Sequence, residues 1–92
     1  MRLIDFNRST IDLHPALEVF WEHDHVTTPI VDILPATAKQ IVLVSGAGHA
    51  LTLDQLRTRC QQMAPHANLF IAADTPIRLY GYRLVPHQIL LG

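Results

Sequence analysis

Four consecutive apolar residues, Ile41 to Val44, limit the fold of this chain more than any other feature. Neither the odd nor the even positions of this run are polar, so a strand formed here has two apolar faces. Such a strand lies inside a sheet that is covered on both sides. The run therefore predicts a central strand from Gln40 to Ser45, in a domain that combines helices with a sheet.

The start of a helix follows this strand. Thr52 and Gln55 stand three residues apart, the spacing of a capping box, in which each side chain hydrogen-bonds to the backbone amide of the other residue. Five apolar residues then share one helical face: Leu53, Leu56, Cys60, Met63 and Ala64. Pro65 should end this helix, because proline breaks the helical hydrogen-bond pattern.

An earlier segment also has helical spacing. Leu17, Phe20 and Trp21 lie at positions i, i+3 and i+4. Pro15 favours the first position of a helix, and the β-branched residues that follow residue 25 favour its end. We therefore expect a helix from Pro15 to about residue 24 or 25.

The remaining apolar stretches predict strands. Four of them have the length and composition of strands: Arg2–Phe6, Ile30–Leu34, Asn68–Ala73 and Ile77–Val85. The chain then closes with an apolar tail, Ile89 to Leu91. We expect this tail to dock on another surface, such as a neighbouring subunit, because chain ends otherwise fray.

This order of elements is the ferredoxin-like pattern β-α-β-β-α-β with an extra C-terminal strand. We expect a single α+β domain over residues 1–92, with a mixed sheet of four to five strands and two helices on one face. The two halves show no sequence repeat. An alternative is a smaller sheet, in which residues 30–34 form only an extended loop.

The chain is rich in apolar residues for its size. Of its 92 residues, 49% are hydrophobic and only 16% are charged, against a usual charged share of about 25%. A small domain has little interior, so part of this apolar surface should lie outside and mark an interface. We expect the chain to form a homo-oligomer, most simply a homodimer, or to bind another protein.

Charge and cysteine content narrow the class of protein further. The formal net charge is −1, whereas general nucleic-acid binding relies on clustered Lys and Arg. Cys60 is the single cysteine, so no internal disulfide can form. No apolar run reaches the ~18 residues of a membrane span, and the first residues lack the apolar core of a signal peptide. The sequence predicts a soluble, cytoplasmic protein.

The glycine-containing turn from Ser45 to His49 is the segment most similar to a phosphate-binding motif. It is not a Walker loop, because no lysine follows Gly48. It is not a dinucleotide fingerprint either, because Leu51 stands where the third glycine belongs. In the expected fold, however, the loop at residues 7–10 opens on the same edge of the sheet, where ligands tend to bind.

An alternative to an interaction module is that these two loops form a rim that binds a small anion or a nucleotide-like ligand. The candidate ligand-binding residues are Arg8, Ser9, Ser45, Gly46, Gly48 and His49. Arg8 supplies a fixed positive charge, and His49 is a candidate general base because imidazole titrates near neutral pH. The alternative is that the glycines only supply positive φ angles for a turn.

The last predicted strand alternates arginine and tyrosine. Arg78, Tyr80 and Tyr82 should fall on one of its faces, and both residue types are enriched at protein interfaces. With the apolar tail, the candidate interface residues are Arg78, Tyr80, Tyr82, Ile89, Leu90 and Leu91. The same alternation suits an RNA-contacting sheet, which stacks bases on aromatic rings, and this is a second alternative.

No catalytic or metal centre is evident in the sequence. His23 and His25 are two residues apart, so on a helix they point to opposite sides and cannot share a metal ion. Cys60 lies on the apolar face of its helix, where nothing favours a reactive thiolate. We therefore expect a small homo-oligomeric binding or interaction module without catalytic activity, cofactor or metal.

Overall fold

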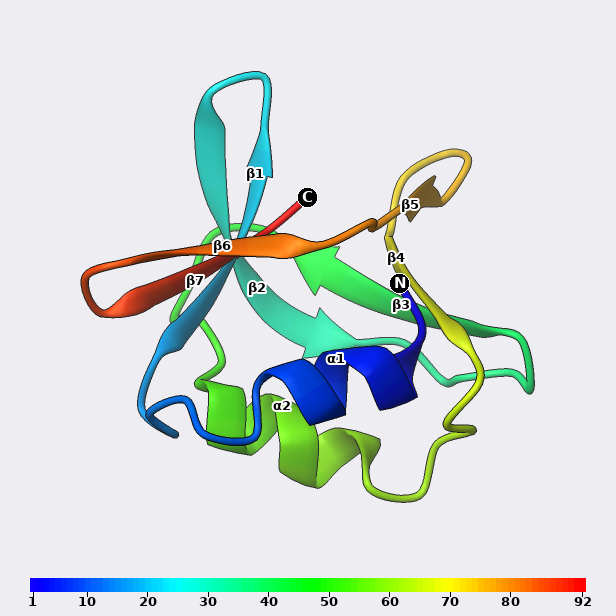
Figure 1. The fold of residues 1–92 in the computed structure, drawn as a ribbon. Coiled ribbons are helices and arrows are strands. Elements are labelled where there is room, and N and C mark those ends of the chain that lie inside the picture. The colour runs from blue at the N-terminus through cyan, green and yellow to red at the C-terminus, as the bar shows by residue number, and fades with distance from the viewer.

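The computed structural model describes residues 1–92 as one sheet with two helices (Figure 1). In chain order, the elements are α1 (Leu3–Ser9), β1 (Glu18–His23), β2 (Val26–Ile33), β3 (Gln40–Ser45), α2 (Leu53–Cys60), β4 (Asn68–Ile71), β5 (Ile77–Arg78), β6 (Tyr82–Val85) and β7 (Gln88–Leu91). The strands lie in the order β5-β4-β3-β2-β1-β7-β6. Neither helix is long and apolar enough to cross a membrane.

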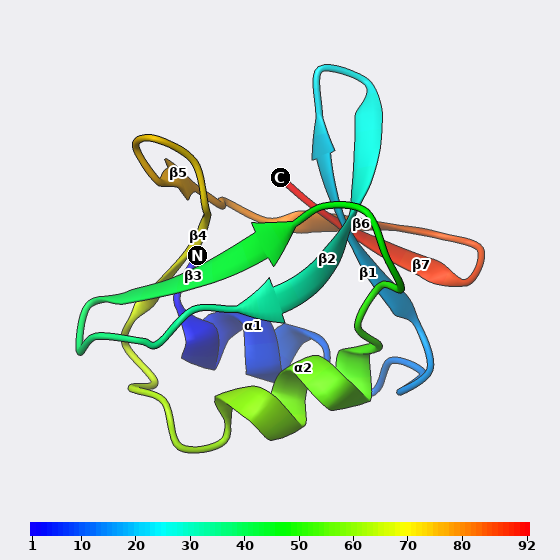
Figure 2. The same cartoon turned by 180° about the vertical axis from the view of Figure 1, so that it is seen from behind.

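The ferredoxin-like prediction is wrong. The sheet has seven strands rather than four or five, and it curls into a half-barrel (Figures 1 and 2). Its parallel pairs are β3 with β4 and β1 with β7, and every other neighbouring pair is antiparallel. The helices do not cover one face of an open sheet, because they lie side by side at one end of the curled sheet (Figure 2).

The two edge strands of the sheet are consecutive in the chain. β5 pairs with β4, and β6 pairs with β7, while residues 79–81 connect them. In this connection Leu79 N–H donates to Leu69 O at 2.9 Å, and the backbones of Gly81 and Gly92 exchange bonds of 3.2 and 3.0 Å. The single strand expected from Ile77 is therefore interrupted, and its two parts bring both edges of the sheet to one segment of chain.

Two N-terminal elements have the opposite type from that predicted. The first, expected as a strand, is α1, which buries Leu3 and Phe6 one turn apart. The second, expected as a helix from Pro15, is β1. Val19 is fully buried in β1 and Trp21 packs against the core beside it. The core side chains of this segment are therefore two residues apart, as in a strand, and not three or four apart, as in a helix. A strand also suits a segment rich in β-branched and aromatic residues.

The central strand and the capped helix are confirmed. β3 occupies the predicted residues and lies between β2 and β4. Both bonds of the capping box are present: Gln55 N–H donates to Thr52 Oγ1 at 3.1 Å, and Thr52 N–H donates to Gln55 Oε1 at 2.9 Å. The helix ends at Cys60 rather than at Pro65, because the chain turns there and Met63 N–H donates to Cys60 O at 3.1 Å.

The apolar tail forms a strand inside the sheet of its own chain. β7 lies between β1 and β6, and Ile89, Leu90 and Leu91 are all buried. The tail therefore docks within this chain and not on a neighbouring subunit. Its position also explains the extra apolar content near the C-terminus, since a strand with neighbours on both sides needs apolar side chains.

A helix followed by strands occurs twice, with three strands after α1 and four after α2, although the two halves share few identical residues. Two isolated β-bridges show the relation: Arg2 pairs with Asn68, and Thr52 pairs with Glu18. Arg2 and Thr52 lie 50 positions apart, and so do Glu18 and Asn68, so the two bridges occupy equivalent places in the two halves. Three buried pairs follow the same rule: Leu3 with Leu53, Phe6 with Leu56, and Thr10 with Cys60. Where the helices meet, Leu3 of α1 lies near Cys60 of α2, and Thr10 at the end of α1 accepts a hydrogen bond from Arg57.

Candidate functional site

The N-terminal half of the predicted rim is a helix end, not a loop. Arg8 and Ser9 belong to the last turn of α1, so they do not follow a strand as the prediction required. The Ser9 hydroxyl donates to Phe6 O at 3.1 Å, and Arg8 is exposed. Ligand binding by these residues stays a prediction, but its geometric basis is lost.

The other half of the rim is the turn between β3 and α2, which the backbone holds in place. Ser45 ends β3, and Gly46 N–H donates to Pro29 O at 3.0 Å. Gly48 has a φ of +133°, which residues with side chains rarely adopt. His49 is exposed, and no hydrogen bond or ion pair connects this turn with α1. The turn fits the alternative in which glycine serves the backbone, and ligand binding here stays a prediction.

The candidate interface residues have very different surroundings. The three from β7 are buried in the sheet. Tyr82 is partly buried and packs edge-on against Phe6, with ring centroids 6.0 Å apart. Tyr80 is 76% exposed, and the Arg78 guanidinium lies 5.5 Å from its ring centroid. Arg78 and Tyr80 are thus the two that present their side chains to the surroundings.

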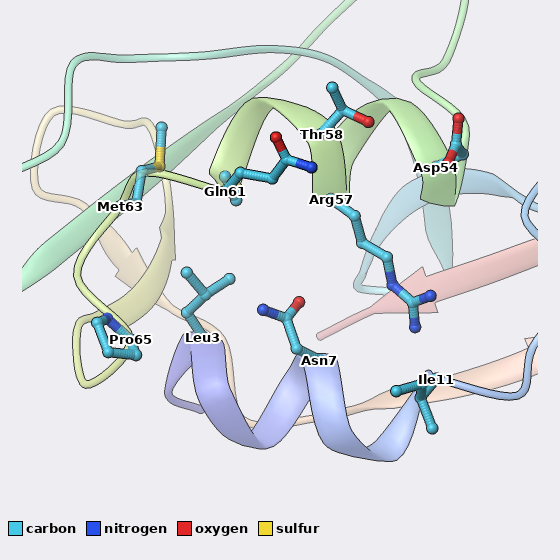
Figure 3. Close-up of a pocket in the computed structure, with 10 residues that line it drawn as sticks. Leu3, Asn7, Ile11, Asp54, Arg57, Thr58, Gln61, Met63 and Pro65 are labelled. Atoms are coloured by element: carbon cyan, nitrogen blue, oxygen red, sulfur yellow. The ribbon is translucent and has the colours of Figure 1, made fainter.

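A groove of about 510 Å³ lies between α1 and α2 (Figure 3). Ten residues line this inter-helix groove: Leu3, Asn7, Ile11, Asp54, Arg57, Thr58, Cys60, Gln61, Met63 and Pro65. Small-molecule sites have volumes of about 300–1,000 Å³. The three residues from the α1 side recur every four positions, so they form one face of the helix and its continuation.

Arg57 reaches across the inter-helix groove to the end of α1 (Figure 3). Its Nη2 donates to Thr10 Oγ1 at 2.5 Å, and the Thr10 hydroxyl donates to Phe6 O at 2.7 Å. Thr10 is fully buried. Because the only hydroxyl proton of Thr10 is used by the Phe6 carbonyl, its oxygen serves the guanidinium as an acceptor. This chain of bonds fixes the position of the Arg57 charge.

Arg57 has no carboxylate partner. The ion pairs that arginines form in this chain are Arg2–Asp5, Arg59–Asp32 and Arg83–Glu22. Arg57 Nε is buried without a hydrogen bond, and so is Asn7 Oδ1 on the facing helix. A buried polar atom without a partner costs about 1–3 kcal/mol. A ligand that bonds to both atoms would remove this cost.

Cys60 gives the groove a neutral thiol. Burial raises the pKa of this thiol to about 11, so it is protonated near neutral pH. A protonated thiol is a weak nucleophile and behaves as a small apolar group. Cys60 therefore lines the inter-helix groove as an uncharged side chain.

Sequence reasoning missed this groove because it assigned the first segment to a strand. With a strand expected at residues 2–6, Asn7 falls in a turn, and no helix is expected beside Arg57. One signal was present: the three-residue spacing of Leu3 and Phe6 is that of a buried helix face. No group of three or more His, Cys, Asp or Glu side chains in the chain is arranged to hold a metal ion.

Comparisons with protein-family models, with curated proteins and with solved structures gave no significant match to this chain. Its function is therefore inferred from its own groove and surface.

Proposed function

We propose that this chain is a small binding module that holds an anionic ligand in the inter-helix groove without transforming it. The observation that carries the proposal is Arg57, a half-buried guanidinium that Thr10 anchors and no carboxylate neutralises. A charge at such a site is screened less than one on the open surface. Guanidinium groups also form strong paired hydrogen bonds with carboxylate and phosphate.

The surroundings of Arg57 supply other parts of an anion site. The side-chain amides of Asn7 and Gln61 point into the inter-helix groove from opposite helices (Figure 3), and amide N–H groups can orient a polar head. The carbonyl end of α1 lies beside the guanidinium and favours a cation there. The end of α1 and the Thr10 hydroxyl hold Arg57 in place, but neither neutralises its charge as a carboxylate would.

The proposed anion site lies between the helices and not at the rim expected from the sequence. Residues 7–10 still take part through Asn7 and Thr10. Their partner is Arg57 of α2, which faces them across the groove, and not the turn at residues 45–49. A binding role without catalysis agrees with the neutral state of Cys60 near neutral pH.

Nuclear magnetic resonance of the ¹⁵N-labelled protein tests this function. Titration with acetate, octanoate, inorganic phosphate and adenosine monophosphate should show at least one anion that shifts amide signals along the inter-helix groove. It should also shift the Arg57 Nε–H signal, which burial protects from exchange with water. The proposal fails if none of these anions shifts these signals.

A pair of matched variants shows whether Arg57 is the anion-binding group. Arg57→Gln should lose the shifts, because it keeps a long polar side chain without the charge. Arg59→Gln, two residues further along α2, should bind as the wild type does, because Arg59 pairs with Asp32 and does not line the groove. Equal binding by wild type and Arg57→Gln would contradict the proposal.

A second candidate function, which we also propose, is self-association through the surface around Tyr80. It is favoured by the 76% exposure of this ring and by the Arg78 guanidinium stacked on it. Sedimentation velocity should show a dimer that dissociates in Tyr80→Ser. Val26→Ser is the control, because Val26 is 61% exposed but lies at the β1–β2 hairpin. A wild-type monomer at all concentrations would contradict this candidate.

A further inference from the structure

We infer that the ligand of the inter-helix groove is a monocarboxylate with an apolar body, such as a medium-chain fatty acid. This inference rests on the proposed anion binding by Arg57 and adds the chemical class of the ligand. Three features of the groove lead to it: its two unlike ends, its single cation with a neighbouring carboxylate, and its buried unpaired polar atoms.

The two ends of the inter-helix groove differ in polarity. Figure 3 shows Leu3, Met63 and Pro65 together at one end, and Arg57 at the other, with Asn7 between them. A ligand that fills the groove therefore places a polar head against Arg57 and an apolar body toward Leu3. The neutral Cys60 thiol lines the groove as well and does not disfavour an apolar body.

The charge of the groove selects a single negative charge. Arg57 is the only cationic residue that lines it, and Asp54 lines it too, one turn earlier on α2. A carboxylate head carries one charge, which Arg57 can balance. A phosphate monoester carries nearly two, and the groove has no second cationic residue to balance the other charge. The planar guanidinium fork also matches the two oxygens of a carboxylate.

The unpaired polar atoms place the head of the ligand. Arg57 Nε and Asn7 Oδ1 are buried without a hydrogen-bond partner, so a head group that enters between the two side chains meets both of them. A carboxylate accepts from the guanidinium, and a turned Asn7 amide donates to it through Nδ2.

Titration calorimetry with a series of simple compounds tests the ligand class. Acetate, butyrate and octanoate keep the head and lengthen the body, and we expect affinity to rise by up to about fourfold for each methylene that the groove buries. Octan-1-ol lacks the charge and octyl phosphate adds a second one. Both should bind at least tenfold more weakly than octanoate, and Arg57→Gln should lower octanoate binding to the level of octan-1-ol.

Asp54→Asn is a second variant, chosen because Asp54 is exposed and its replacement should leave the fold intact. Removing its repulsion should tighten octanoate binding about twofold to fivefold and leave octan-1-ol binding unchanged. Arg59→Gln again serves as the control and should leave both affinities unchanged.

The possible outcomes separate the class of ligand from the function itself. If acetate, phosphate or octyl phosphate binds as tightly as octanoate, and Arg57→Gln abolishes that binding, the anion function stands and the monocarboxylate inference is wrong. If no anion binds, or if octanoate and octan-1-ol bind equally to wild type and to Arg57→Gln, the anion function fails and the inference fails with it.

Discussion

Two leucines near the C-terminus, Leu84 and Leu91, have very different surroundings. Leu91 is fully buried in β7, whereas Leu84 in β6 is 49% exposed. Leu91→Ala should lower the free energy of unfolding by about 2–5 kcal/mol, the usual cost of removing a buried leucine side chain. Leu84→Ala should lower it by less than about 1 kcal/mol. Urea denaturation of both variants measures the difference, and equal costs would contradict the placement of β7 inside the sheet.

The single thiol offers a second test at the scale of one residue. Because burial raises the pKa of Cys60 to about 11, iodoacetamide should alkylate the folded protein at pH 7.5 far more slowly than the chain unfolded in urea. Mass spectrometry of quenched samples measures both alkylation rates, and the modified site is known because Cys60 is the only cysteine. Similar rates in the two states would mean that the thiol is accessible in the folded protein.

The cap of α2 tests stability at the scale of one element. Thr52→Ala removes the hydroxyl that accepts from Gln55 N–H, and it should cost about 0.5–2 kcal/mol of unfolding free energy. Thr52→Ser should keep most of that energy. Thr58→Ala is the matched control inside the same helix, and it should cost little because the Thr58 side chain makes no hydrogen bond. Thermal or urea unfolding would contradict the prediction if both alanine variants lost the same stability.

Elements with strong local signals could be predicted from the sequence, and those set by distant partners could not. The capping box and the apolar run of β3 carry their own information, and both were predicted. β1 has residues that suit a helix and a strand equally, and its pairing with β2 and with β7, whose residues lie far along the chain, decides between them. The groove depended on α1, so Asn7 and Arg57 could not be brought together without the correct first element.

An ion pair connects strands at the scale of the whole molecule. Arg83 Nε of β6 donates to Glu22 Oε1 of β1 at 2.8 Å, across the intervening β7. The hydrogen bond from Arg83 lowers the pKa of the Glu22 carboxyl below its ordinary value of 4.5. A folded pKa below the unfolded one means that the pair stabilises the fold above pH 4.5. This stabilisation is lost as the pH falls through the folded pKa.

We therefore expect the urea concentration at the unfolding midpoint to decrease as the pH is lowered below about 4.5. In Glu22→Gln this decrease should be less steep. Arg2 and Arg59 lower the pKa of Asp5 and Asp32 in the same way, so part of the acid sensitivity should remain in this variant. Glu18→Gln, on the same strand but without an ion pair, should follow the wild-type curve. A pH profile of Glu22→Gln that coincides with wild type would contradict a role for the pair.

The position of β7 between β1 and β6 affects how the protein folds during its synthesis on the ribosome. β1 is made early, but its parallel partner Gln88 to Leu91 is translated about 70 residues later, which takes roughly 4 to 14 seconds at 5–20 residues per second. Until then one side of β1 has unpaired backbone groups, the kind of edge that promotes aggregation. The nascent chain thus depends on timely completion of its sheet, or on a chaperone that shields this edge meanwhile.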